Sequence, residues 1–503
     1  MKLIPIIGLE IHVQLNTKSK MFCSCPNVDD GNSPNTAICP ICTGQPGALP
    51  LLNSESLKKG ILVGMALNCD IPDQSAFDRK NYFYPDLPKG YQISQFFHPI
   101  ALNGYLDLDT PENNIKNRKH IRIGITRAHL EEDAAKNFHN QTNNEKPTTF
   151  VDFNRAGTPL IEIVTEPDFR SANEAKIFLQ ELRNIMRAIN VSNADMEKGQ
   201  MRCDVNISML EVDENNLPLY KTLNPRTEIK NLNSFRSVEK AIEYEIKRQT
   251  ALYKTNTPPI EATRGWDESL GKTTEQRTKE NSADYRYFPE PDIPPQDLTK
   301  LKEELKDSLP ELPNETRQRL QQENNLSIKD ANFFINHRQW LEFFEQISSE
   351  IPGWIPKPRD EQKIAKLIGG WLTTKLVGIL SEEDKTFQEK NITAENFAEF
   401  ISIIYKGEVN SSNGQKLLRL MISTGQDPSI LMEKHNLGQN LPEEELINII
   451  KRNLEANPQK IQEIKNGKTQ LIKWFVGLVM RDSNGQANPQ KTEAEITKQI
   501  QNL

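Results

Sequence analysis

Two polar residues near the N-terminus, Glu10 and His12, occupy one side of an alternating segment. Leu9 and Ile11 alternate with them, and this period-two pattern is typical of a half-buried strand. An imidazole beside a carboxylate is able to bind a metal ion, directly or through water, or to transfer protons. Each residue alone is equally compatible with a solvated strand face. The chemistry therefore depends on whether other acids reach the same place.

Further acids lie on other segments that alternate or are strongly apolar. An Ile-rich segment ends in Glu131, Glu132 and Asp133. Because neighbouring residues of an extended strand face opposite ways, we expect only one of the first two to join Glu10. Glu162 interrupts an apolar run, where a buried carboxylate is costly unless it is paired or bound to a metal. Of these acids, Glu162 is the one whose setting alone favours a functional role.

A fourth acid, Asp204, lies on the polar side of the alternating segment 201–209, with Glu197 just upstream. Carboxylates from several strands of one sheet supply the hard oxygen ligands that Mg²⁺ needs, and Mg²⁺ in turn holds phosphates. A salt bridge with Arg202 is a simpler explanation for Asp204 taken singly. Taken together, the acids indicate a magnesium–nucleotide site on the sheet.

Four cysteines form two closely spaced pairs, Cys23 with Cys25 and Cys39 with Cys42. Each pair provides two thiolates from one turn, and two such turns complete a tetrahedral site for zinc. The loop between them is rich in Asn, Asp, Gly and Ser, so a metal would explain how it stays ordered. Such a closed site is structural rather than catalytic. The alternative is four unpaired, buried cysteines.

The elements that position these residues change in character along the chain. Before about residue 295, short alternating segments prevail, with helical spacing at 173–189 and 235–250. This pattern predicts an α+β fold built on a largely antiparallel sheet. A Pro-rich break follows at 289–295, and the rest of the chain shows helical spacing to its end.

Composition narrows the class of protein. A chain of 503 residues with 36% hydrophobic and 26% charged residues predicts a globular protein of two or three domains. We expect no membrane partner, because no stretch approaches about 18 apolar residues, and we expect a cytoplasmic location, because no leader precedes Glu10. The net charge of −7 does not indicate a nucleic-acid binder, although basic patches can be local.

One segment resembles a nucleotide-binding motif without meeting its requirements. Residues 265–273 resemble a phosphate-binding loop, but five residues separate the glycines instead of four, and prolines rather than an apolar strand precede them. Any ATP site is therefore of another kind. The chain also lacks a glutaminase signature, so a partner must release ammonia if the reaction uses it.

The motifs resemble those of the B subunits of aspartyl/glutamyl-tRNA amidotransferases, from one end of the chain to the other. The segments that carry the resemblance are Gly8–His12, Phe77–Asp86, Tyr91–Gln95, Arg122–Arg127 with His129 and Glu131–Asp133, Asn154–Glu162, Arg202–Asp204, Lys230–Phe235, Asp284–Asp292 and Gly485–Gln490.

The resemblance implies an enzyme that is a heterotrimer. Its A chain is an amidase-type glutaminase that releases ammonia, its small C chain wraps the interface, and its B chain modifies misacylated tRNA. ATP phosphorylates the side-chain carboxylate of Glu-tRNA(Gln) or Asp-tRNA(Asn), and ammonia arriving through a channel displaces the phosphate. The implied domains are a cradle domain (1–295), a helical domain (296–436) and a YqeY-like tail that binds tRNA (437–503).

The resemblance also implies roles for individual residues. It assigns His12, Glu132 and Glu162 to magnesium, with Glu10, Glu131, Glu197 and Asp204 around the same site. Lys80 is expected to neutralise phosphate or border the ammonia path, although a solvated basic turn explains it almost as well. Zinc belongs to a subset of the family. On the tail, Trp474 and Phe475 are expected in the core, and Lys468, Lys473 and Arg481 are candidates for phosphate contact.

Two other classes of protein compete with this interpretation. A zinc-stabilised RNA-binding module without catalysis would explain the cysteines but leave Glu162 without a purpose. A tRNA synthetase-like adenylating enzyme would need signature motifs, of which Lys18–Met21 is only a loose echo. Consumption of ATP would distinguish an amidotransferase from the RNA-binding module. Release of phosphate rather than AMP would distinguish it from the adenylating enzyme.

Overall fold

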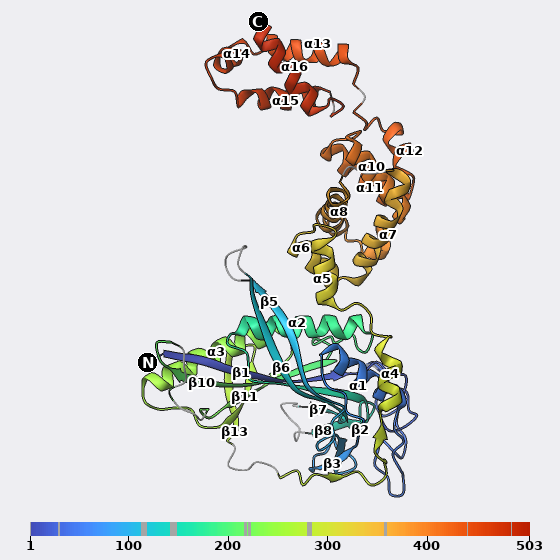
Figure 1. Cartoon of the computed structure of the whole chain (residues 1–503), viewed down its shortest axis with the longest axis vertical. Helices are drawn as coiled ribbons and strands as arrows, with labels where there is room; N and C mark the ends of the chain where they lie inside the picture. Colours follow the sequence, from blue (N-terminus) through green and yellow to red (C-terminus); the bar gives the residue numbers. More distant parts are fainter. Residues whose placement is uncertain are drawn as a thin grey trace. The chain divides into compact units, whose positions relative to one another are not determined.

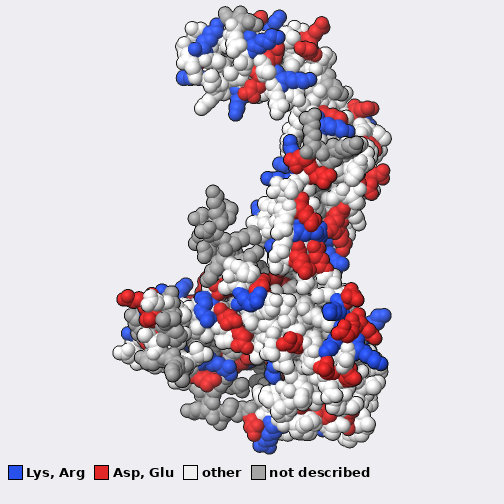
Figure 2. All heavy atoms as spheres, viewed as in Figure 1, with Lys and Arg blue, Asp and Glu red and all other residues white. Residues whose placement is uncertain are grey.

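The computed structural model describes residues 2–28, 31–111, 118–140, 148–215, 219, 223–278, 284–356, 360–439, 441–483 and 485–502. The chain divides into two compact units, residues 1–313 and 314–503. On the face that Figure 2 shows, acidic and basic side chains are interspersed over the described part of each unit.

The first unit is built on one large sheet, to which the described residues contribute eight strands (Figure 1). In spatial order these are β13 (Lys272–Thr278), β12 (Ala262–Asp267), β11 (Thr227–Leu232), β10 (Met201–Val212), β1 (Lys2–Gln14), β9 (Pro159–Thr165), β6 (Arg118–Glu132) and β5 (Ala101–Pro111). Neighbours run antiparallel, except that β11 and β12 are parallel. The predicted α+β class with a largely antiparallel sheet is confirmed.

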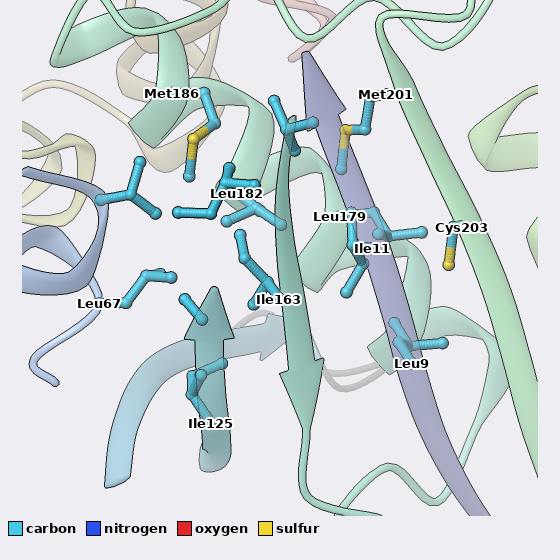
Figure 3. Packing of buried hydrophobic residues seen from close by; sticks show 14 of the residues in the cluster. Leu9, Ile11, Leu67, Ile125, Ile163, Leu179, Leu182, Met186, Met201 and Cys203 are labelled. Atoms are coloured by element: carbon cyan, nitrogen blue, oxygen red, sulfur yellow. The ribbon is translucent and has the colours of Figure 1, made fainter. Parts of the chain in front are cut away.

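Period-two alternation divides the sheet into an apolar face and a polar face. On the apolar face, Leu9 and Ile11 of β1 and Ile163 of β9 are at most 1% exposed. They face Leu179 and Leu182 of the helix α2 (Ala172–Ala188), as Figure 3 shows. Removing each such side chain from water stabilises the fold by roughly 1.5–3 kcal/mol. The acids between these residues are thereby directed to the other face.

Three helices cover the apolar face: α1 (Ser54–Ala66), α2, and α3 (Phe235–Lys254). The Ser171 side chain caps α2 by accepting from the backbone N–H of Glu174, and Ser234 caps α3 by accepting from Ser237. Such caps satisfy backbone donors that the first helical turn leaves unpaired. Both helices predicted from the sequence are therefore present.

Smaller sheets complete the first unit. A three-stranded sheet contains β14 (Phe288–Pro289), β3 (Asp78–Asn81) and β4 (Tyr91–Ser94), and two-stranded ladders pair β15 (Gln296–Asp297) with β2 (Gln74–Ser75) and β7 (Lys136–Asn140) with β8 (Thr148–Asp152). In Figure 1, β3 lies on the side of the main sheet opposite α2. Arg79 of β3 holds the 288–292 segment through a two-pronged ion pair with Glu290, at 2.7 and 2.9 Å. The helix α4 (Thr299–Lys306) follows.

The second unit is helical in its described residues. Its elements are α5 (Pro313–Gln322), α6 (Ile328–Asn336), α7 (Arg338–Trp354), α8 (Glu361–Gly370), the π-helical η2 (Trp371–Leu376), α9 (Val377–Glu382), the 3₁₀ turn η3 (Phe387–Lys390), α10 (Ala394–Lys406), α11 (Ser411–Thr424), α12 (Pro428–Lys434), α13 (Glu443–Glu455), α14 (Pro458–Lys465), α15 (Leu471–Asp482) and α16 (Pro489–Asn502).

This unit contains two hydrophobic clusters, one spanning Leu320–Leu437 and one spanning Leu446–Ile500. The motif Gly485–Gln490 lies between the two clusters. It contacts the residue before α11, because Asn410 Nδ2 donates to Gly485 O at 2.6 Å. Phe475 is buried in the second cluster, as predicted. The prediction that Trp474 lies in the core is wrong, because this side chain is 42% exposed; its ring makes an edge-to-face contact with Phe475.

One continuous helical stretch, Glu361–Glu382, is long and apolar enough to cross a membrane, with a mean hydropathy of 1.3 over its 18-residue window. The expectation that no stretch reaches this level is therefore wrong. Half of the window is buried inside the protein, as in a core helix of a globular domain, so the stretch is weak evidence for a membrane span.

Candidate metal and phosphate site

Three strands bring a row of polar side chains into register on the polar face. His12 of β1 pairs with Glu162 of β9, and Glu162 pairs in turn with His129 of β6. Residues directly opposite across antiparallel strands have side chains within contact distance. Glu131 lies two residues beyond His129, so it faces the same way. The alternation predicted for Glu10 and His12 extends in this manner to a site built from three strands.

The ring of His12 lies between two carboxylates. Its Nε2 is 3.4 Å from Oε1 of Glu131 and 3.3 Å from Oε2 of Glu162. His129 Nε2 reaches the same Glu162 oxygen at 3.2 Å. Ligand atoms of His12, Glu131 and Glu162 all lie within 4.8 Å of one another, so the three side chains are close enough to share one metal ion. Two carboxylates and one imidazole are a mixed donor set whose hard oxygens suit Mg²⁺.

The protonation states of His12, Glu131 and Glu162 depend strongly on one another. Burial alone lowers the pKa of His12, but hydrogen bonds to Glu131 and Glu162 outweigh it and raise that pKa to about 10. The imidazole is therefore a cation at neutral pH. Burial alone raises the pKa of Glu162, but the charge of His129 and the hydrogen bond to His12 bring it well below its usual range. Burial alone raises the pKa of Glu131 too, but the hydrogen bond to His12 outweighs it and lowers that pKa, so both carboxylates are ionised.

Glu10 belongs to a neighbouring group on the same face. It pairs in register with Asp204 of β10, and its Oε1 accepts from Asn206 Nδ2 at 2.9 Å. Asp204 in turn pairs with Lys230 of β11 at 2.6 Å. Burial, followed by the charge of Glu162, raises the pKa of Glu10. Of the carboxyl groups of Glu10, Glu131 and Glu162, that of Glu10 is therefore the one best suited to carry a proton.

Lys80 of β3 approaches the acids from the opposite layer, among aromatic rings. Its Nζ lies 4.9 Å from the centre of the Tyr285 ring. Burial alone lowers the pKa of Lys80, but the charge of Glu131 and other anions raises it above the ordinary lysine value. Tyr287 stacks on Phe96 with ring centres 4.1 Å apart. A positive charge and a wall of aromatic rings thus border the carboxylates.

The structure separates Glu132 from this group. Its carboxylate pairs with Lys89 Nζ at 2.5 Å and accepts from the backbone N–H of Ile93 at 3.0 Å. As expected from alternation, only one of the two adjacent glutamates joins the cluster, and it is Glu131. Glu197 is exposed in the turn before β10 and pairs locally, through its backbone N–H, with the Asp195 side chain.

Several members of the site are recognised only in three dimensions. Sequence reasoning gave no role to His129, Asn206, Lys230 or Tyr287, although His129, Lys230 and Tyr287 lie in its motifs. His129 has a signal that could have found it, because it precedes Glu131 by two residues in an alternating run. Tyr287 has none, because only the fold brings residues 284–292 beside β3.

The four cysteines form a second group, as predicted. Their sulfurs lie within 4.8 Å of one another, and the Cys39 and Cys42 sulfurs are 3.8 Å apart. A tetrahedral zinc site with Zn–S bonds of about 2.3 Å has edges of about 3.8 Å. The hydrogen bond from Cys23 lowers the pKa of Cys42 below the ordinary value of a thiol. The cluster could therefore hold a structural metal ion.

The apparent phosphate-binding loop is a hairpin. Residues 262–267 form β12 and residues 272–278 form β13, and the two strands pair directly across the turn. No helix follows the glycines within the described residues 265–278, so the motif has none of the geometry of a phosphate-binding loop. Its rejection is confirmed.

Comparisons with known proteins identify the family. Residues 5–304 match the family model described as the GatB/GatE catalytic domain, and residues 358–500 match the GatB domain model. The chain belongs to the GatB family. Curated relatives named as the B subunit of aspartyl/glutamyl-tRNA(Asn/Gln) amidotransferase include those of Thermotoga petrophila (43% identical, covering 99% of each chain) and Persephonella marina (44% identical, 96% of this chain and 97% of the relative). The Thermoanaerobacter pseudethanolicus protein is 39% identical and covers 99% of this chain and 100% of its own.

Membership of the GatB family makes this chain part of an amidotransferase, which is an enzyme. The catalytic-domain match ends at residue 304, so it covers the large sheet, both acid groups and the four cysteines. The site described above therefore lies wholly inside the part of the chain that resembles the family's catalytic domain.

Proposed function

We propose that this chain is the B subunit of a tRNA-dependent amidotransferase that works in the cytoplasm with two partner chains, a glutaminase and a small third chain. ATP would phosphorylate the side-chain carboxylate of Glu-tRNA(Gln), Asp-tRNA(Asn) or both, and ammonia from the glutaminase would then replace the phosphate. The observation that carries the proposal is the His12–Glu131–Glu162 group on the catalytic-domain sheet. Such a group serves no purpose in a module that only binds RNA.

The residues suggest a division of labour. Glu131 and Glu162 would hold Mg²⁺, and His12 would join them as a ligand once the incoming ion displaces its proton, with Asp204 and its neighbours as further candidates. When bound, this ion neutralises phosphate charge and orients the phosphates. Lys80 adds a fixed positive charge at the rim, where phosphate oxygens arrive or ammonia enters. Glu10, whose pKa is raised, would take up or release a proton during the reaction.

The cysteine cluster would hold zinc as a structural ion. Four sulfur donors close the coordination sphere, so no position remains for a substrate. The pairing of Asn154 with this loop supports a structural role, because Asn154 Oδ1 accepts from the backbone N–H groups of Thr36 and Ala37 at 2.9 and 2.8 Å. Metal binding would thereby order a loop that has little hydrophobic core of its own.

The test uses the assembled complex with glutamine, ATP and Glu-tRNA(Gln). We expect formation of Gln-tRNA(Gln) with release of inorganic phosphate. Glu162→Gln should lower the rate about 10²–10³-fold, the usual effect of removing one charge-stabilising group from an active site. Glu166→Gln is the matched control, since Glu166 is exposed at the end of the same strand. Release of AMP, or an undiminished rate in Glu162→Gln, would contradict the proposal.

A further inference from the structure

Lys20 is completely buried, with 0% of its surface exposed. It follows β1 in the loop that leads to the first cysteine pair. Lysine is almost never fully buried unless its charge is paired, because removing an ammonium group from water is expensive. The surroundings of Lys20 must therefore compensate its charge.

The ammonium group of Lys20 has three acceptors. Its Nζ donates to Ala37 O at 2.8 Å, to Phe153 O at 3.3 Å and to Cys42 Sγ at 3.7 Å. An ammonium carries three N–H donors, and these contacts use all of them. Two acceptors are neutral carbonyls. The third is the sulfur of Cys42, a member of the four-cysteine group.

The charge of a loaded metal site would be offset by this contact. Four thiolates around a divalent ion carry a formal charge of −2. Cys42, which Lys20 contacts, is one of the two buried cysteines of the cluster; the other is Cys23. An ammonium at the Cys42 sulfur would reduce the formal charge of the loaded site to −1. Groups beside the ligands commonly tune metal affinity in this way.

Lys20 also joins two segments that are distant in sequence. Ala37 and Cys42 belong to the cysteine loop, whereas Phe153 begins the turn that leads into β9. The backbone N–H of Met21 donates to Gly157 O at 2.7 Å in the same turn. Strand β9 carries Glu162, so the cysteine loop and the acid group are connected through this turn.

We propose that Lys20 is a positioning residue of the four-cysteine metal site. Its ammonium contacts the Cys42 sulfur, offsets the charge of the loaded site and fastens the cysteine loop to the turn before β9. This inference rests on the proposed occupancy of the cysteine cluster by zinc.

The experiment measures zinc release from the purified full-length chain in its complex. Zinc content is determined first, and release into a chromogenic chelator is then followed over time. Lys20→Met should release zinc at least about 10-fold faster than the natural protein, within the usual range for the loss of a group that supports the ligands. Lys20→Arg, which keeps the charge, should restore most of the difference. Lys18→Met is the control, because Lys18 is exposed two residues away.

Cobalt loading gives a second readout that a general loss of stability would not reproduce. Sulfur-to-cobalt charge-transfer bands should show four thiolate ligands in Lys20→Met, as in the natural protein, while release remains faster. If Lys20→Met does not fold, Lys20→Gln keeps a hydrogen-bonding side chain without the charge and decides the question in its place.

The outcomes separate the two proposals. A natural protein that holds no zinc and takes none up contradicts the metal site and this inference together. A zinc-loaded natural protein whose charge-removing variant releases zinc at the same rate overturns the role of Lys20 alone. Rescue by Lys20→Arg together with fast release from Lys20→Met supports it.

Discussion

At the scale of single residues, Glu131 and Glu132 are adjacent in sequence and opposite in environment. Glu131 faces His12 across the sheet. Glu132 is held by Lys89 and by the backbone of β4. Carboxylates that border a cationic imidazole suit metal and phosphate chemistry, whereas a carboxylate paired with a buried lysine suits the fold. The two positions should therefore fail in different ways.

We expect Glu131→Gln to lower amide formation about 10²–10³-fold with little loss of stability. We expect Glu132→Gln to lower the free energy of unfolding by about 3–5 kcal/mol, because it leaves the largely buried Lys89 without its partner. Steady-state rates and urea unfolding of both variants are the measurements. A stable, inactive Glu132→Gln would instead place Glu132 in the catalytic group.

The sequence predicts that acids gather around His12, but it does not predict which of Glu131 and Glu132 is one of them. Period-two alternation is enough to put Glu10 and His12 on one face, and it predicts that one of Glu131 and Glu132 joins them. It does not reveal how far β6 is shifted against β9, and a shift of one residue exchanges the faces. Register depends on packing across the whole sheet, so the choice of Glu131 required the structure.

At the scale of elements, close approach between α1 and β5 depends on glycines. A Cβ on Gly104 of β5 would lie 2.2 Å from Cys69 Sγ and 2.6 Å from Leu67 O, just after α1. The second of these atoms belongs to the backbone and cannot rotate away. A Cβ on Gly8 of β1 would meet nothing closer than 3.6 Å. The same substitution therefore has different consequences in two strands of one sheet.

Gly104→Ala should lower the free energy of unfolding by about 1–3 kcal/mol, as overpacking usually does. Gly8→Ala, the matched control in the same sheet, should change it by less than about 1 kcal/mol. Urea unfolding followed by circular dichroism measures both. Equal stabilities of the two variants would show that α1 can move away from β5 without loss.

Elements with strong periodicity were predictable, and elements fixed by tertiary pairing were not. The helices α2 and α3 and the strand β10 follow from spacing alone. The two-residue strand β14 and the parallel pairing of β11 with β12 have no local signal, because each exists only through a distant partner. Strand β14 brings Tyr287, the residue before it, beside β3, whereas Lys230 reaches Asp204 through the pairing of β11 with β10.

At the scale of the whole molecule, the last helices have their own hydrophobic cluster, and the motif at Gly485 contacts the preceding helices. Trp474 is 42% exposed on α15, beside the exposed Lys473. An exposed indole next to a lysine is a common way to contact RNA, by stacking and by charge. The exposure of Trp474 therefore strengthens the prediction that this tail binds tRNA.

Removal of residues 441–503 should weaken tRNA binding at least about 10-fold and reduce its dependence on salt, because each lost phosphate contact lowers the slope against log salt by nearly one. Assembly with the partner chains should survive, since the family's catalytic domain is left whole. Lys473→Glu should weaken binding in the same direction, whereas Lys300→Glu, an exposed lysine on α4, is the control. Filter binding at several salt concentrations and size-exclusion chromatography measure the two properties. Unchanged tRNA affinity in an assembled, truncated complex would contradict the prediction and move the principal RNA contact to residues 1–440 or to the partner chains.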